Sequence, residues 1–395
     1  MQEELKILFS RLLLFVIVLL VIPGLSYGIW WVQQKKEFGI VLLDKTVPNT
    51  SYSEHSGLFW ILEHEKIVKP NSSEFFQLDQ DYFGYFPASE NEKEGFVKDF
   101  SAMDNAEKSR LVSENQVFII ADTYGIYRPN DSESVSLLSK QKIYGGLDPS
   151  DLDVISMAQQ QGKTIIAEYN SMASPTTATV RSQFENQMGI KWTGWVARYF
   201  DELDTLVNAA LPQWLISNYK SQHENGWSYS GPGLVFVHET GQIEIFDART
   251  DYQNEVPFIR TPRQNKGNFI LPEIVPYPDW FDVVLIQRDY EVISYYDINP
   301  TDEGLARLRG MGLPRFFPAV VFKPNQNGRV YYFSGDFSDL NLNFGSPRFW
   351  GLATLWRGYY SVTDFRDRQS FFWNYYEPLM NQILNQAYRD QTNND

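Results

Sequence analysis

The sequence predicts an α/β fold in which a mostly parallel sheet is flanked by helices and preceded by one transmembrane helix. Three features support this prediction. Short apolar runs end in polar residues, amphipathic segments separate these runs, and one long uncharged segment lies near the N-terminus. Strands that alternate with helices form right-handed βαβ units, and such units build parallel sheets.

The uncharged segment covers residues 12–32 and follows a short N-terminal tail, residues 1–11. At 1.5 Å per residue it reaches roughly 31 Å, close to the thickness of the hydrocarbon core of a bilayer. Trp30 and Trp31 stand at its far end, where indoles favour the membrane interface. We therefore expect a single-pass signal-anchor. A short tail before a long domain also predicts that the domain lies outside the cytoplasm.

A cleaved signal peptide is the alternative interpretation of this segment. Ser26 and Gly28 place small residues at the −3 and −1 positions of a cleavage site. Against cleavage, the apolar run continues through Tyr27, Ile29 and the two tryptophans. The retained anchor is the interpretation that we carry forward.

The first half of the remaining chain alternates between predicted strands and helices. Asp148 and Pro149 mark one helix start, and Gly162 follows the end of that helix. Ser53 is the predicted N-cap of an earlier helix. Residues 69–110 are polar and irregular, with an aromatic island at 81–87, and predict a long surface loop. The expected strands are 37–46, 117–122 and 164–168, and the expected helices are 53–67, 148–161 and 177–188.

The second half predicts shorter strands and a closing helix. His-Glu-Thr-Gly-Gln between two apolar runs is typical of a hairpin. We expect a linker at 33–37 and then one elaborated domain over 38–395, with a subdivision, if any, near 190–230. The expected strands are 233–238, 243–246, 281–286, 318–322 and 330–335, and the expected helices are 302–311 and 371–389.

Composition excludes several classes of function. The chain has 49 acidic and 34 basic residues and a formal net charge of −15, so it repels phosphate backbones and does not predict nucleic-acid binding. It has no cysteine, which excludes disulfides, thiolate metal sites and cysteine nucleophiles. Aromatic residues make up 16% of the chain, which predicts either a ring-rich core or exposed rings of the kind that bind sugars.

Four acidic residues follow apolar runs directly: Asp44, Asp122, Glu168 and Asp336, the last within Gly335-Asp336-Phe337-Ser338-Asp339. The carboxyl ends of parallel strands meet at one edge of a sheet, where such folds bind ligands. Carboxylates gathered there are candidates for acid and base catalysis, or for holding a hard divalent cation. Turn formation and helix capping are the structural alternative for each of them.

Other residues are candidates for ligand binding at the same edge. Tyr124 and Asn170 belong to the segments that follow two of the strands, and His55 can approach Asp44. Two indoles and an arginine in the segment 192–200 predict a stacking platform with a cation beside it. The alternative for this segment is packing into the core. The binding candidates are therefore His55, Tyr124, Asn170, Trp192, Trp195 and Arg198.

The order of strand 40–44, helix, strand 117–122, Gly145-Gly146, helix and strand 164–168 resembles that of class I glutamine amidotransferase-like domains. The late VYYFSGDFSD segment is also similar to the closing strand of such domains, which occur in uncharacterised membrane-anchored bacterial envelope proteins. The resemblance implies a flavodoxin-like sheet with a ligand crevice over its strand ends. Glutamine hydrolysis is excluded because the family's nucleophile is a cysteine and this chain has none.

Two functions follow as expectations. The first is a membrane-tethered, non-catalytic domain that binds a glycan or a partner protein in the cell envelope without a cofactor. The alternative is a carboxylate-dependent hydrolase acting on an envelope saccharide, for which two carboxyl groups roughly 5–9.5 Å apart are needed. Carboxylates crowded at one edge raise one another's pKa, so we expect either a divalent cation or a basic neighbour, Lys45 or Arg198.

Overall fold

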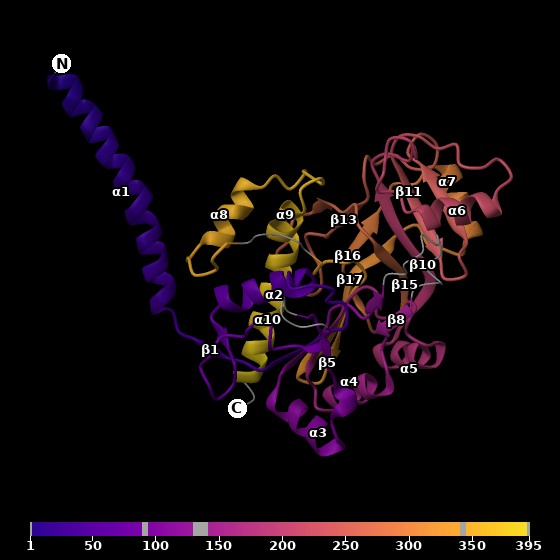
Figure 1. The fold of residues 1–395 in the computed structure, drawn as a ribbon, viewed down its shortest axis with the longest axis horizontal. Coiled ribbons are helices and arrows are strands. Elements are labelled where there is room, and N and C mark those ends of the chain that lie inside the picture. Colours follow the sequence, from indigo (N-terminus) through magenta and orange to yellow (C-terminus); the bar gives the residue numbers. More distant parts are fainter. Residues whose placement is uncertain (1, 89–93, 129–140, 340–344, 393–395) are drawn as a thin grey trace.

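The protein combines a ten-stranded mixed sheet, a four-stranded antiparallel sheet and helices that pack around them (Figure 1). The computed structural model describes residues 2–88, 94–128, 141–339 and 345–392. Its helices are α1 (Gln2–Val32), α2 (Ser53–His64), α3 (Asn105–Glu114), α4 (Pro149–Gln160), α5 (Ala178–Met188), α6 (Gln213–Gln222), α7 (Asp302–Gly310), α8 (Leu352–Tyr359), α9 (Arg368–Phe371) and α10 (Glu377–Thr392), with a 3-10 turn η1 (Phe100–Ala102) and a π-helical turn η3 (Phe372–Tyr376).

The large sheet contains a parallel centre with antiparallel extensions on both edges. Strands β18, β9, β6, β2 and β4 are parallel neighbours in that order. From edge to edge the sheet is β14 (Ile274–Pro276), β13 (Phe258–Arg260), β16 (Glu291–Asp297), β17 (Phe317–Asn325), β18 (Gly328–Phe333), β9 (Thr164–Ala167), β6 (Val117–Ile120), β2 (Ile40–Asp44), β4 (Phe83–Phe86) and β5 (Phe96–Lys98). The α/β fold with a mostly parallel central sheet is therefore confirmed.

The smaller sheet is antiparallel and contains the predicted hairpin. Two pairs of short strands lie outside both sheets, β1 (Lys36–Glu37) with β3 (Ile67–Val68), and β7 (Ile126–Arg128) with β8 (Gln141–Tyr144). The four-stranded sheet has the order β12 (Ile243–Asp247), β11 (Gly233–His238), β10 (Ile190–Phe200) and β15 (Phe281–Ile286).

Local sequence signals explain several helix ends. Asp148 caps α4 and forms a capping box with Asp151, so three backbone N–H groups, those of Asp148, Ser150 and Asp151, are satisfied. Thr177 caps α5, and Gly189 ends that helix with a φ of 73°, a left-handed conformation that glycine adopts without strain. Ser53 is instead the first residue of α2, because Tyr52 occupies the cap position with a φ of 50° and no side-chain cap.

The segment 69–110, expected to be a loop, contains regular structure. Its aromatic island is β4, which pairs with β2 in parallel and with β5 in an antiparallel arrangement. Asn105 to Glu114 form α3, whose capping box joins Asp104 to Glu107. Residues 83–86 alternate between half-buried and buried positions. A few aromatic residues around one glycine are too short a pattern to distinguish a strand from a loop.

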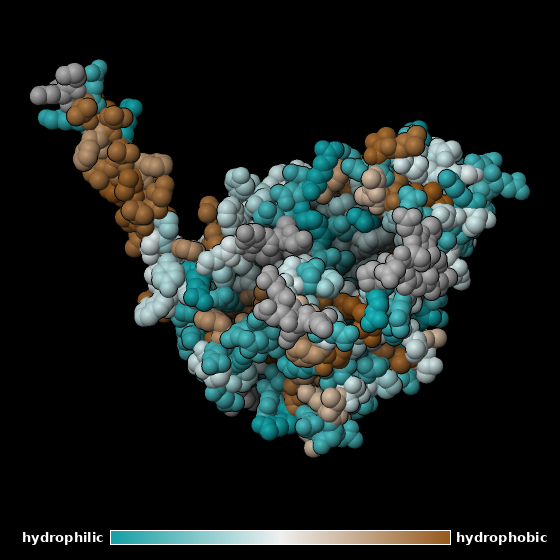
Figure 2. All heavy atoms as spheres, in the orientation of Figure 1, coloured by the Kyte–Doolittle hydropathy of each residue, from teal (hydrophilic) through white to brown (hydrophobic). Residues whose placement is uncertain are grey.

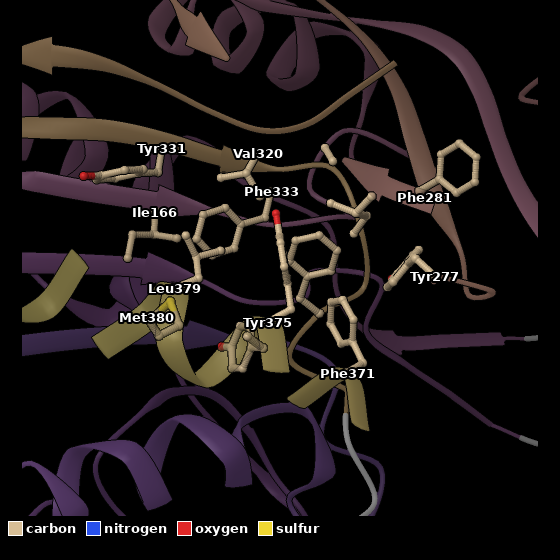
Figure 3. Close-up of a cluster of buried hydrophobic side chains, with 14 of the residues drawn as sticks. Ile166, Tyr277, Phe281, Val320, Tyr331, Phe333, Phe371, Tyr375, Leu379 and Met380 are labelled. Carbon is tan, nitrogen blue, oxygen red and sulfur yellow. The ribbon is translucent and has the colours of Figure 1, made fainter. Parts of the chain in front are cut away.

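The C-terminal segment covers one face of the large sheet. Tyr375 and Leu379 project from η3 and α10 toward Phe333 of β18 and Val320 of β17 (Figure 3). The hydroxyl of Tyr375 forms a hydrogen bond with Ser294 of β16. Most of the rings in this cluster are fully buried, so the high aromatic content serves the core here.

Helix α1 projects from the body, and its apolar middle lies between a hydrophilic N-terminal tip and a paler base (Figures 1 and 2). Within the described part of the chain it is the one helix long and apolar enough to cross a membrane, and a signal sequence has the same features. Its last turn is part of the body, since Trp30 is buried and donates to the carbonyl of His64 at 2.9 Å. Residues 33–37, expected to be a linker, include β1, which pairs with β3.

Candidate functional site

The four predicted acidic residues lie at the carboxyl ends of neighbouring parallel strands of the large sheet. Asp44 ends β2, Asp122 follows β6, Glu168 follows β9 and Asp336 follows β18, and these four strands are adjacent and parallel. Adjacent strands are about 4.8 Å apart, so their carboxyl ends bring these residues together. Their charges also interact, because Asp122 raises the pKa of both Glu168 and Asp336.

Asp44 is held by donors of the protein itself. Its Oδ2 is 2.6 Å from Nδ1 of His55, and its Oδ1 accepts the backbone N–H of Thr46 at 3.0 Å. The other ring nitrogen of His55 is 3.0 Å from the carbonyl oxygen of Leu78. Both ring nitrogens therefore lie beside oxygen atoms of the protein, so His55 has no free nitrogen for a ligand.

Asp122 and Glu168 are buried carboxyl groups that retain a proton to unusually high pH. Burial raises the pKa of Asp122 to about 7, although the N–H of Tyr124 donates to it at 2.6 Å and Asn170 lies 3.4 Å away. Burial raises the pKa of Glu168 to about 8, with the hydroxyl of Tyr376 at 3.4 Å from its Oε1. Tyr124 and Asn170 therefore contact Asp122, and both are half-buried.

Glu54, which the sequence analysis did not single out, completes a second group of carboxylates. Oxygen atoms of Glu54, Asp336 and Asp339 all lie within 4.8 Å of one another. Glu54 is 7% exposed, and its Oε2 has no hydrogen-bond partner within the described residues. Burial and the charges of Asp122, Asp339 and Asp336 raise the pKa of Glu54 well above its ordinary value. An unpaired buried carboxylate oxygen is costly, and within the described residues Oε2 of Glu168 is a second such oxygen among these acids.

Among the described residues, the cationic side chain that contacts this group is neither of the two predicted ones. Arg368 of α9 pairs with Asp279 and donates to the carbonyl oxygens of Asp336 at 3.1 Å and Asp339 at 3.0 Å. Its charge lowers the pKa of Asp336 and Asp339, but burial and mutual repulsion outweigh it and both values stay raised. Arg368 stands in the C-terminal segment, far from the strand ends in sequence, so no local pattern indicated it.

Lys45 and Arg198 have other roles. Lys45 is buried and pairs with Asp148 at 2.8 Å and Asp151 at 2.6 Å, which joins the end of β2 to the start of α4. Arg198 lies over the rings of Phe200 and Trp280. It also lowers the pKa of Tyr169, the residue after Glu168, but burial keeps that value well above normal. Neither side chain pairs with the acids of the strand ends within the described residues.

The proposed stacking platform is not exposed. Trp192 and Trp195 are 7% and 4% exposed, and the indole N–H of Trp192 donates to the carbonyl of Trp195 at 2.9 Å. Arg181 lies over the ring of Trp192 and His238 packs on Trp195. Two tryptophans on one strand favour core packing as strongly as a surface platform, and here β10 turns them into the core.

Comparisons with known proteins give distant structural similarity alone. No family model matches the chain, and no curated protein matches it. The chain is similar to the crystal structure of a putative ThuA-like protein from Bacteroides uniformis ATCC 8492, with 10% identity, a TM-score of 0.37, and coverage of 80% of this chain and 89% of that one. It is also similar to a cold-adapted beta-galactosidase from Rahnella sp. R3, with 9% identity, a TM-score of 0.33, and coverage of 78% of this chain and 30% of that one.

Proposed function

We propose that the protein is a membrane-tethered, non-catalytic domain that binds a divalent cation at Glu54, Asp336 and Asp339 and, through that cation, a hydroxyl-rich ligand of the glycan class. The observation that supports it most is the buried Oε2 of Glu54, which lacks a partner within the described residues and belongs to a group of three carboxylates. The anchor is α1, and we propose that the domain lies on the extracytoplasmic side.

The charge balance supports a cation. Glu54, Asp279, Asp336 and Asp339 interact with one another or with the single guanidinium of Arg368. If all four carboxyl groups were ionised, the guanidinium of Arg368 would balance only one of their four negative charges. Burial and this imbalance raise the pKa of Glu54, Asp336 and Asp339, and a divalent cation would let these groups ionise. The donors are carboxylate oxygens without nitrogen or sulfur, which suits Mg²⁺ or Ca²⁺ better than a softer metal.

The strand order supports a ligand at this edge. The five parallel strands can be numbered in chain order, so that β2 is first, β4 second and β6 third. Across the sheet, these strands then have the order 2-1-3-4-5. This is the flavodoxin-like order, in which ligands bind at the switch point between the first and third strands. Asp44 and Asp122 end those two strands, and α2, which begins nine residues after Asp44, carries Glu54.

Binding is favoured over hydrolysis because the two acids at the switch point are already engaged. Both oxygens of Asp44 accept from Thr46 and His55, and both oxygens of Asp122 contact Tyr124 and Asn170. A general base needs a lone pair within reach of the proton that it removes, and each of these four oxygens already directs one lone pair toward a group of the protein. One feature favours the hydrolase alternative. Asp122 has a pKa of about 7 and lies near Asp44, which is held by His55. Two carboxyl groups whose surroundings give them different pKa values can act as an acid and a base.

Calorimetric titration of the full chain in detergent with Ca²⁺ or Mg²⁺ tests the cation. We expect one site per chain, and loss of that site in Glu54→Gln. Glu303→Gln is the matched control, because it removes the same charge from an exposed position in the first turn of α7. Binding that is equal in all three proteins, or absent from the unsubstituted chain, would contradict the proposal. Saccharide hydrolysis that Asp122→Asn abolishes would favour the alternative.

A further inference from the structure

Helix α8 presents apolar side chains to the outside of the molecule beside the anchor helix. Leu355 and Tyr359 are 64% and 73% exposed, and Trp350, just before the helix, is 55% exposed. Scattered exposed apolar residues are ordinary, but three large ones within ten residues form a patch that needs a partner. In Figure 1, α8 and α1 lie on the same side of the body.

The apolar residues of α8 form one stripe. At 100° per residue, Leu352, Leu355, Trp356 and Tyr359 fall within about 100° of the helix circumference. Leu352 and Trp356, on one side of this stripe, pack against the core. Leu355 and Tyr359, on the other side, face away from the body. The helix is therefore amphipathic beyond what its packing on the body requires.

Contacts with α1 fix the level of this patch along the anchor. The hydroxyl of Ser26 donates to the carbonyl of Trp350 at 2.8 Å, and the N–H of Trp350 donates to the carbonyl of Ser26 at 3.2 Å. The rings of Tyr27 and Phe349 meet edge to face at 6.0 Å. Ser26 stands six residues before Val32, which is about 9 Å along a helix axis.

A helix needs about 20 apolar residues to cross the hydrocarbon core of a bilayer, and the uncharged segment of α1 begins at Leu12. A hydrocarbon core that begins near Leu12 therefore extends to about Trp31. The contact between Ser26 and Trp350 lies about 7.5 Å inside that end, within the roughly 5–10 Å to which interfacial helices bury their apolar face. We propose that residues 349–359 form a second membrane contact, in which Trp350, Leu355 and Tyr359 insert into the boundary between headgroups and acyl chains of the bilayer that α1 crosses. This inference rests on the anchoring part of the proposed function and is independent of the cation site.

The chemistry of the surface indicates apolar insertion rather than charge attraction. The chain has a formal net charge of −15, which disfavours anionic lipids. Of the nearby basic residues, Arg348 pairs with Glu63 at 2.5 Å and Arg357 pairs with Glu377 at 2.7 Å. Tryptophan and tyrosine are the residues that prefer the interface. We therefore expect the contact to form on zwitterionic phosphatidylcholine.

A cavity of about 800 Å³ separates α8 from the base of the anchor. It is lined by Trp30, Trp350 and polar residues that include Lys36, Glu65 and Arg357. In water, the cavity leaves this side of α8 with little support from the rest of the protein. Contact with a bilayer would stabilise α8 from outside and would limit movement of the body relative to α1.

The absence of cysteine makes a depth measurement direct. The test variants are Leu355→Cys and Tyr359→Cys, each with a single cysteine. Leu19→Cys reports on the anchor, and Leu206→Cys is the control, because Leu206 is 94% exposed and lies between β10 and α6. Each full-length variant is labelled with a small fluorophore and reconstituted into phosphatidylcholine vesicles that contain nitroxide-labelled lipid.

We expect quenching by the nitroxide at positions 19, 355 and 359 that is several-fold stronger than at position 206. Quenching at 19 but not at 355 or 359 would overturn the second contact while leaving the anchor. Lack of quenching at 19 would overturn both. Disulfide-linked dimers of Leu355→Cys without lipid quenching would mean that a second copy covers this surface, and would also overturn the proposal.

Discussion

The Nδ1 atom of His55 lies 2.6 Å from Oδ2 of Asp44, and both side chains are completely buried. This pair joins the end of β2 to the first turn of α2, the turn that also carries Glu54. The position of Glu54 relative to Asp336 and Asp339 therefore depends on a contact between two residues that lie outside this group of three carboxylates.

Replacing His55 by alanine leaves the carboxylate of Asp44 buried without its partner. Leaving a buried hydrogen-bonding group without its partner costs about 1–3 kcal/mol, and more when that group is charged. We expect His55→Ala to lower the free energy of unfolding by an amount in that range, measured by urea denaturation of the detergent-solubilised chain. His223→Ala is the control, since His223 is half-buried and stacks on Tyr219 with ring centroids 4.0 Å apart, a contact worth about 0.5–1.5 kcal/mol. Equal losses in the two variants would contradict a paired role for His55.

Stability in the presence of a chelator should fall as the pH rises. The pKa of Glu168 is about 8 in the folded protein, far above the ordinary value of 4.5. Between these two values the folded chain keeps a proton that the unfolded chain releases, so each rise in pH favours unfolding. We expect a higher melting temperature at pH 5.5 than at pH 8, and a smaller difference in Glu168→Gln, which has no proton to lose. A melting temperature that rises with pH would contradict this account of Glu168.

Cation binding should weaken as the pH falls. Burial and neighbouring acids raise the pKa of Glu54 and Asp336, and a carboxyl group must lose its proton before it binds a metal. The apparent affinity for Ca²⁺ should therefore decrease from pH 8 to pH 6, and binding should release protons. Calorimetry in buffers with different ionisation enthalpies measures that release, and a release of zero at pH 7 would be inconsistent with the site.

The base of the anchor helix should contribute to the stability of the body. Trp30 is 4% exposed, stacks on Phe75, and lies beside Lys66, which donates to the carbonyl oxygens of residues 30, 31 and 33. Trp30→Ala should cost about 3–5 kcal/mol of the free energy of unfolding, as for other buried aromatic truncations. Trp31→Ala is the adjacent control because Trp31 is 66% exposed, and it should cost far less. Similar losses would mean that α1 does not pack on the body.

The sequence alone located four of the five parallel strands, all except β4, and the side of the sheet where their acids meet. Runs such as 117–122 and 164–168 are apolar and end in an acid, and a strand buried on both faces produces that pattern. The helix cap at Asp148 was equally visible, because capping depends on a few adjacent residues.

What the sequence could not supply depends on contacts between distant segments. Glu54 lies beside Asp336 and Asp339, which come 282 and 285 residues later in the chain, and Arg368 belongs to a short helix near the C-terminus. The burial of Trp192 and Trp195 depends on which face of β10 meets the core, and the docking of Trp30 depends on α2 and Lys66. Local patterns contain no information on these pairings.

Anomalous diffraction from crystals of the full chain soaked with Mn²⁺, an oxygen-seeking stand-in for Mg²⁺ or Ca²⁺, tests the central claim most directly. We predict one strong anomalous peak with carboxylate oxygens of Glu54, Asp336 and Asp339 at about 2.0–2.6 Å, and its disappearance in Glu54→Gln. A peak at another group of acids, or none at Glu54 when the soaking concentration is far above the affinity measured in solution, would contradict the claim.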